Sequence, residues 1–166
     1  MILGMSTSTF TFLHVLISLL GIASGLVVMY GFLAAKRLDG MNTLFLVTTV
    51  LTSVTGFFFP NEHITPAIIL GILSLVVLAI AIAARYGLHL NGAGRWLYVV
   101  TASVALYLNV FVLVVQSFEK VPALHALAPT QKEPPFAVAQ LAVLVLFIVL
   151  TALAIKKFRI DPVHAR

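Results

Sequence analysis

Charged side chains are scarce in this sequence: they make up 9% of its 166 residues, whereas 61% are hydrophobic. A water-soluble domain typically carries about 25% charged residues. So few charges cannot cover a water-exposed surface, which excludes a soluble protein and predicts that lipid surrounds most of the chain. The length suits one domain, so we expect residues 1–166 to form a single transmembrane helical domain.

Cysteine is absent, which excludes a disulfide framework, a thiolate metal site and a cysteine nucleophile. Acidic and basic residues are also missing from the interior of every long apolar run. Charges inside a membrane mark proton relays and ion paths, so their absence argues against a proton-coupled pump or an ion transporter. The sequence contains no nucleophile elbow, phosphate loop, dinucleotide fingerprint or paired zinc-helix motif, and we expect no enzyme of a familiar kind.

Long apolar runs dominate what is present. They cover residues 12–35, 41–59, 67–84, 96–118 and 136–155. A helix of about 20 residues spans the hydrocarbon core, and in lipid the backbone must satisfy its own hydrogen bonds. The sequence therefore predicts an all-α membrane protein, a bundle of five transmembrane helices. We expect the first run to be a retained span and not a signal peptide, because it lacks a basic start.

The basic residues predict the orientation of the bundle. One side would carry Lys36, Arg37, Arg85, Arg95, Lys156, Lys157, Arg159 and Arg166, and the other Lys120 and Lys132. Cytoplasmic connections are enriched in Lys and Arg, so we expect the N-terminus outside and the C-terminus in the cytoplasm. This placement at the ends of apolar runs also explains the net charge of +5 without nucleic acid. A proline-rich connection, residues 119–135, would then lie on the outer side.

Uncharged polar side chains within the spans predict a candidate outer pocket. Its residues are His14, Thr55, Asn109, Gln116 and Gln140. Depth counted from the basic anchors places them in the outer half of the bundle, with residues 119–135 as a lid. An amide in hydrocarbon needs a partner, and we expect Gln140 to pair with Asn109 or Gln116. Two interpretations remain open: structural hydrogen bonds between helices, or the lining of a site for a quinone, lipid or haem.

Two further patterns concern helix packing. Thr48, Thr52 and Thr55 follow i, i+4, i+7 spacing and share one helix face, where hydroxyls either pack or line a ligand. Gly21 and Gly25 have the small-xxx-small spacing that lets a second helix approach closely. That second helix would belong either to the same chain or to another copy of it.

Histidines raise the question of a metal site. The candidate ligands on the outer side are His14, Glu62, His63 and His125. Imidazole and carboxylate groups bind zinc or copper, but these four residues show no recognisable ligand spacing. We therefore predict no metal site and treat them as side chains solvated at the membrane interface.

Three stretches, "TSVTGFFFP", "GILSLVVLAIAIAARY" and "LYLNVFVLVVQSFEKVPALHALAPTQKEPPF", resemble an uncharacterised family of small polytopic inner-membrane proteins of bacteria. The resemblance runs from the first span to the last, and "VPALHALAPTQ" before "EPPF" is its most specific part. It implies a multi-pass protein of the bacterial inner membrane, and nothing about a reaction.

Three functions follow from these patterns. The first is a non-enzymatic helical bundle that self-associates or serves as an accessory subunit of a larger membrane complex. The second is a membrane-embedded binder of a small hydrophobic ligand or redox cofactor in the outer half. The third is a carrier of an uncharged solute, ranked last because five spans allow no complete inverted repeat in one chain.

Overall fold

The computed structural model describes residues 1–60 and 63–159, and within them the only β-pairing is an isolated bridge between Ile2 and Met5. The elements are α1 (Thr7–Leu33), α2 (Asp39–Gly56), α3 (Pro66–Ile82), the π-helical turn η1 (Ala83–Gly87), α4 (Ala93–Lys120), the short α5 (Pro122–Leu127) and α6 (Pro134–Lys157). The five predicted runs therefore coincide with five long helices, and the proline-rich connection holds α5. Within the described residues the all-α prediction is confirmed.

Local sequence explains where several helices begin. The Ser6 hydroxyl accepts a hydrogen bond from the amide of Thr9 at 3.1 Å, which caps α1. The Thr65 hydroxyl does the same for Ile68 at 3.4 Å, and Pro66 follows it as the first residue of α3. Pro134 likewise opens α6, because its missing N–H is one that a first turn leaves unpaired anyway.

Within the described residues, four helical segments are long and apolar enough to cross a membrane: α1, α3 continued by η1, α4 and α6. Helix α2 is not among them. It has 18 residues and begins with Asp39, and it carries Asn42 and several hydroxyl side chains. Length and composition thus support a membrane protein with four spanning helices, and a fifth crossing by α2 stays a prediction.

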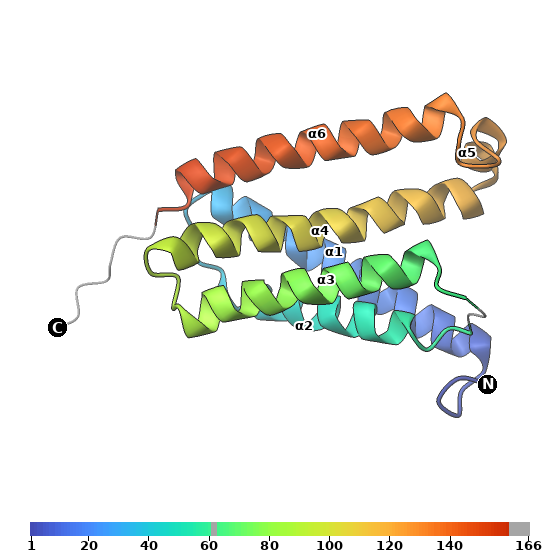
Figure 1. The fold of residues 1–166 in the computed structure, drawn as a ribbon, viewed down its shortest axis with the longest axis horizontal. Helices are drawn as coiled ribbons and strands as arrows, with labels where there is room; N and C mark the ends of the chain where they lie inside the picture. The colour runs from blue at the N-terminus through green and yellow to red at the C-terminus, as the bar shows by residue number, and fades with distance from the viewer. Residues whose placement is uncertain (61–62, 160–166) are drawn as a thin grey trace.

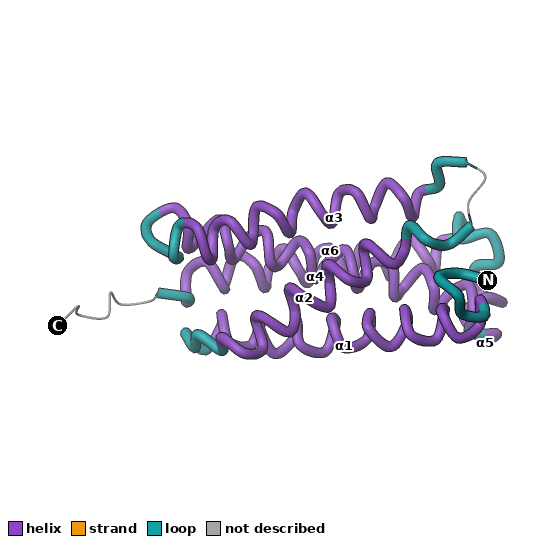
Figure 2. The backbone as a smooth tube through the Cα atoms, turned by 90° about the horizontal axis from the view of Figure 1, so that it is seen from below, coloured by secondary structure: helices purple, strands orange, loops and turns teal. Residues whose placement is uncertain are grey.

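Helix α4 is the centre of the bundle (Figure 1). It packs against α1, α3 and α6. Helix α6 packs mainly against α4 and, less extensively, against α1. Small residues on its buried faces, such as Ala102 and Ala105, let the neighbours come close. The axes of the long helices lie roughly along the long axis of the bundle in both views, so each helix runs from one end of the bundle to the other (Figures 1 and 2).

The glycines of α1 pack inside the chain. A Cβ on Gly25 would lie 2.5 Å from Leu106 Cδ1 in α4 and 2.9 Å from the Phe45 ring in α2. A Cβ on Gly21 would lie 3.2 Å from the Thr48 hydroxyl. The small-xxx-small pair is therefore occupied by helices of the same chain, and it offers no support for self-association.

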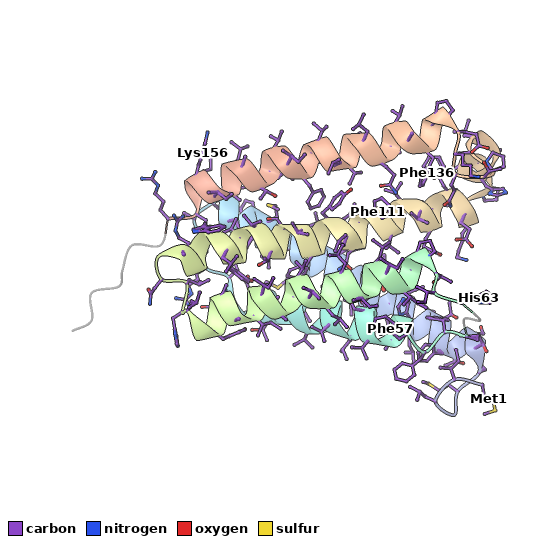
Figure 3. All side chains as sticks on the ribbon, in the orientation of Figure 1. Met1, Phe57, His63, Phe111, Phe136 and Lys156 are labelled. Atoms are coloured by element: carbon purple, nitrogen blue, oxygen red, sulfur yellow. The ribbon has the colours of Figure 1, made fainter. Side chains whose placement is uncertain are left out.

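The two ends of the bundle differ in charge. We call the end with the α1–α2 connection, the η1–α4 connection and the last residue of α6 the basic end, and the other the opposite end. Lys156 lies at the basic end, while Met1 and His63 lie at the opposite end (Figure 3). All the basic residues predicted for one side belong to elements of the basic end, except Arg166, which is outside the described residues.

Candidate functional site

Two residues of the predicted outer pocket meet at the opposite end of the bundle. Nδ1 of His14, near the start of α1, lies 2.7 Å from the hydroxyl of Thr55, near the end of α2. That hydroxyl donates its own hydrogen to the Leu51 carbonyl at 2.7 Å. Thr55 must then accept from His14, which fixes the hydrogen on Nδ1. Phe59 packs edge-on against the imidazole with ring centres 5.1 Å apart.

The other three predicted pocket residues bond elsewhere. Asn109 lies near the middle of α4 and donates through Nδ2 to the Thr49 hydroxyl at 3.2 Å. Gln116 is exposed and donates to Glu119 of its own helix at 3.4 Å. Gln140 donates to the Phe111 carbonyl at 3.2 Å, so its partner is neither Asn109 nor Gln116. Of the five residues, only His14 and Thr55 are joined directly.

The candidate metal ligands do not gather in the structure. His63 is exposed, and Nδ1 of His125 lies 3.3 Å from the Phe118 carbonyl, to which it can donate. Among residues 1–60 and 63–159, no three His, Asp or Glu side chains come close enough together to hold a metal ion. Glu62 lies outside the described residues.

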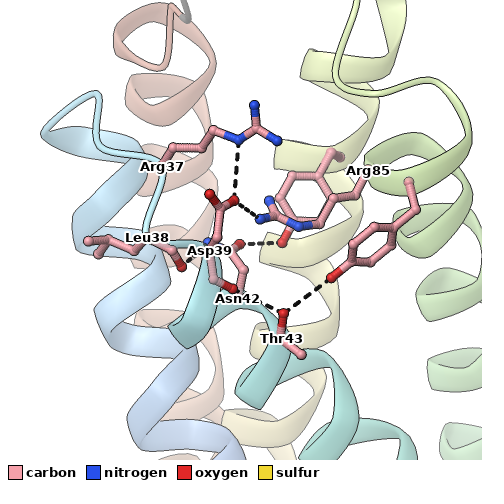
Figure 4. A network of polar contacts seen from close by, with 8 residues as sticks. Arg37, Leu38, Asp39, Asn42, Thr43 and Arg85 are labelled. Carbon is pink, nitrogen blue, oxygen red and sulfur yellow. Dashed lines mark hydrogen bonds and ion pairs between the residues drawn. The ribbon is translucent and has the colours of Figure 1, made fainter.

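A polar cluster at the basic end was not anticipated from the sequence (Figure 4). We call it the basic-end network; it consists of Arg37, Asp39, Asn42, Thr43, Arg85, Tyr86 and Tyr98. Arg85 donates through Nη2 to Oδ1 of Asp39, and Arg37 donates through Nε to the same oxygen at 3.2 Å. The Tyr98 hydroxyl donates to Oδ1 of Asn42. The network therefore joins the starts of α2 and α4 to the end of α3.

Arg85 is the most unusual member, because only 4% of this charged residue is exposed. Its Nε and Nη1 have no hydrogen-bond partner in the described part of the chain. The guanidinium instead lies over two aromatic rings, 5.2 Å from the centre of Tyr98 and 5.6 Å from that of Tyr86. A cation over an aromatic face gains about 0.5–2 kcal/mol, which partly offsets the loss of water.

The π-helical turn η1 is what directs Arg85 inward. A π-turn widens the helix and shifts the register of the residues in it, and such turns are frequent at functional sites. Here it extends α3 to Gly87, so that Arg85 belongs to the apolar segment Pro66–Gly87. The predicted run 67–84 carries no charge, and Arg85 is the residue that follows it; what the sequence did not predict is that Arg85 is buried. A hint was present in the sequence: Asp39 and Arg85 have opposite charges at the same predicted side.

Among the grooves on the described part of the bundle are two shallow apolar ones, and neither includes a residue of the predicted outer pocket. The first, of about 250 Å³, lies between α2 and α3 and reaches Thr43 and Tyr86 of the basic-end network. The second, of about 320 Å³, lies between α4 and α6 and contains Tyr107 and Thr151. We call them the α2–α3 groove and the α4–α6 groove.

No protein family, curated protein or solved structure matches this chain. What the chain does is therefore inferred from its own side chains and their arrangement.

Proposed function

We propose that this chain is a non-enzymatic integral membrane subunit, with five crossings of a bacterial inner membrane, that self-associates or accompanies a larger membrane complex. The observation that carries the proposal is the distribution of apolar side chains. Val138 and Leu141 of α6 are 65% and 60% exposed, and Ile69 and Ile72 of α3 are 58% and 54% exposed. Water would oppose such a surface, whereas acyl chains solvate it.

Polar groups inside the bundle support the same proposal. Thr48 donates to the Leu44 carbonyl at 2.7 Å, and Ser53 donates to the Ser74 hydroxyl at 3.1 Å. Asn109 donates to Thr49 as described above. The bonds of Ser53 to Ser74 and of Asn109 to Thr49 each join two helices, and such bonds contribute about 0.6 kcal/mol each in lipid, whereas the Thr48 bond lies within α2. They account for most of the buried hydroxyls of α2 without a bound ligand.

The packing of α2 against helices that are long and apolar enough to span the membrane supports a fifth crossing by α2. It packs extensively against α1 and also against α3, and it runs between the two ends of the bundle (Figure 1). Its polar side chains Asn42, Thr48, Thr49 and Ser53 are all buried, so they face protein and not lipid. At 1.5 Å per residue its 18 residues extend about 27 Å, close to the hydrocarbon thickness of about 30 Å.

The role of a subunit is supported by the hydrogen bonds that the polar side chains of the predicted pocket already make. The predicted pocket residues are hydrogen-bonded to one another, to other side chains or to the backbone, while the outward faces of α3 and α6 are apolar. Because Gly21 and Gly25 pack internally, any contact with another subunit would use a different face, and α6 is the most exposed of the long helices.

Cysteine labelling tests the membrane topology cleanly, because the chain has no native cysteine. We expect Lys36→Cys and His63→Cys, on either side of α2, to react with a membrane-impermeant maleimide from opposite faces of the membrane. His63→Cys should react in intact cells, and Lys36→Cys only after permeabilisation. Reaction of both from the same face would show that α2 does not cross.

Native electrophoresis in mild detergent tests the association. We expect a species larger than one chain with its detergent, either a homo-oligomer or a complex with another membrane protein. A strictly monomeric species that never co-purifies with a partner would contradict the role of a subunit, while leaving the topology untouched.

A second candidate function, binding of a small hydrophobic ligand in the outer half, has one observation in its favour. Oε1 of Gln140 and Oγ1 of Thr52 are buried without a hydrogen-bond partner in the described part of the chain. A haem would give a Soret band in the purified protein, and a quinone or lipid would appear in an organic extract. Absence of all three would leave the subunit role alone.

A further inference from the structure

We propose that the α2–α3 groove binds an anionic phospholipid, with one acyl chain in the groove and the phosphate at its basic-end mouth beside Thr43, Tyr86 and Arg37. The site rests on the proposed insertion of α2 and α3 in the membrane, and it goes beyond the subunit role by naming a ligand. Its parts are an apolar trough, a pair of hydroxyls and an excess of positive charge.

The trough has the character that an acyl chain requires. Leu46, Val47, Val50 and Leu51 of α2 line one wall, and Ile82 of α3 lines the other. Nearly all of the exposed groove surface is carbon, and the groove is open along its side. Because a lipid tail reaches such a groove from the bilayer without crossing water, no gate is needed. The groove is thus accessible from the leaflet at the basic end.

Two hydroxyl groups mark the mouth of the groove. The Thr43 hydroxyl donates to the Asp39 carbonyl at 3.1 Å, and the Tyr86 hydroxyl lies 3.3 Å from Thr43 Oγ1. With the Thr43 hydrogen already committed, Tyr86 is the donor of that long bond. Both residues are exposed, so the Tyr86 hydroxyl can turn its hydrogen toward a phosphate oxygen instead.

Positive charge lies one turn of α2 before this mouth, because Asp39, whose carbonyl accepts from Thr43, also binds Arg37 and Arg85. The single carboxylate of Asp39 faces two guanidinium groups, those of Arg37 and Arg85, so one positive charge remains (Figure 4). Only Nε of Arg37 is engaged; its two terminal nitrogens have no hydrogen bond within residues 1–60 and 63–159, and its side chain is 50% exposed. Exposed Lys36 precedes it. Basic sites between helices bind anionic headgroups in this way.

The α4–α6 groove does not offer the same combination. Arg95 donates to the carbonyls of Phe158 and of Ile155, which lines this groove, and the exposed Lys156 follows Ile155 without an ion pair in the described part of the chain. These bonds satisfy the end of α6 and occupy Nη1 of Arg95. The α2–α3 groove is favoured as the site of an anionic lipid because its hydroxyl pair lies beside two arginines that share one carboxylate.

Thermal unfolding of the purified, delipidated protein in mild detergent tests the site. Phosphatidylglycerol or phosphatidylcholine with identical acyl chains is added, with inorganic phosphate in a third arm. We expect phosphatidylglycerol to raise the unfolding temperature more than phosphatidylcholine, and inorganic phosphate to leave it unchanged. Equal effects of the two lipids, or an equal effect of inorganic phosphate, would overturn the proposal.

Matched variants locate the effect. Arg37→Gln should weaken the apparent affinity for phosphatidylglycerol about fivefold, the effect of one basic contact at a membrane surface, while Lys157→Gln on α6 should not. Val47→Trp should fill the groove and abolish the preference, while Val76→Trp, at a residue of similar exposure outside the groove, should preserve it. Equal losses in the Arg37 and Lys157 variants would show a diffuse charge effect, and equal losses in the two Trp variants would show that the lipid does not occupy the groove; either result would overturn the site.

The failure of this proposal is separable from failure of the membrane role. A chain that alkaline carbonate extracts from membranes is not an integral membrane protein, and both proposals fall. A chain that resists extraction but shows no preference for phosphatidylglycerol loses only the lipid site.

Discussion

Gly25 illustrates how a single residue sets the spacing of this bundle. Its Cα faces Phe45 in α2 and Leu106 in α4, both almost fully buried. In a bilayer the helices gain nothing by hiding apolar surface from water, so close packing of this kind supplies much of their attraction. The position tolerates no side chain unless its neighbours move.

Gly25→Val should therefore destabilise the protein. We expect a loss of about 1–3 kcal/mol in the free energy of unfolding, the usual cost of overpacking a core. Thermal unfolding in detergent measures it. Gly40→Ala is the control, because nothing lies within 4 Å of the added Cβ and alanine favours a helix. Equal stability of both variants would contradict the close approach of α1, α2 and α4.

Asp39 is the partner that makes the burial of Arg85 tolerable. Asp39→Asn should lower the stability by about 1–3 kcal/mol, less than for a fully buried pair because the Asp39 side chain is 64% exposed. Adding Arg85→Met to Asp39→Asn should restore part of the loss, since no buried charge then remains. A double-variant cycle in detergent measures this coupling, and strictly additive effects would show that the two residues do not interact.

At the scale of elements, each helix has a different position and a different partner. Helix α4 is central, and α6 is held at its side, where Arg95 of α4 binds the last carbonyls of α6. The turn η1 continues α3 and brings Arg85 under Tyr98. At the opposite end, α5 and the turn after it connect α4 to α6, and Gln131 donates to the Val115 carbonyl at 3.0 Å.

Glu133 organises this last turn. Its carboxylate accepts from the Thr130 hydroxyl at 2.8 Å and from the amides of Thr130 and Lys132. These bonds, the Thr130 hydroxyl first, hold the pKa of Glu133 below its usual range. A lowered pKa means that the carboxylate stabilises the turn above that pKa and that this support is lost as the pH falls through it.

The amide resonance of Thr130 should report this titration. We expect its chemical shift to change with a midpoint below the ordinary glutamate pKa of about 4.3. Glu133→Gln should remove the transition, because the amide group does not titrate. A midpoint at or above the ordinary value would show that the carboxylate does not hold the turn.

At the scale of the whole molecule, the dominant feature is the charge difference between the two ends. Lys36, Arg37, Lys156 and Lys157 belong to the basic end, and Lys120 and Lys132 to the opposite end. The basic end also contains Arg85 and Arg95, whose side chains are engaged in the fold. The same asymmetry would orient the chain in the membrane and attract anionic lipid.

Neutralising the exposed basic residues of the basic end should weaken the orientation. We expect a variant with Lys36, Arg37, Lys156 and Lys157 all replaced by Gln to insert in both directions. A cysteine at Thr130 reports it: its labelling in intact cells should fall relative to the same cysteine in the parent chain. Replacing Lys120 and Lys132 by Gln is the control and should preserve labelling. Unchanged labelling in the fourfold variant would contradict orientation by these charges.

The candidate outer pocket shows how far the sequence reaches. His14 and Thr55 were predicted to lie at the same depth, and the structure does join them. Asn109 and Gln116 share a face by their spacing of seven, yet Asn109 is bonded to Thr49 and Gln116 is exposed. Counting residues from an anchor gives depth along a helix. It does not give the rotation of that helix against its neighbours, which decides what each side chain meets.

By itself, the sequence determined that the chain is helical and apolar enough for a membrane, because hydropathy and run length depend only on the order of residues. It also determined which connections carry basic residues. Only the tertiary structure decided that Gly21 and Gly25 serve internal contacts and that Arg85 turns inward to Asp39 and Tyr98. Those outcomes depend on how helices distant in the chain pack side by side and on one π-turn. The local pattern of residues predicts neither, because both are set by contacts between distant parts of the chain.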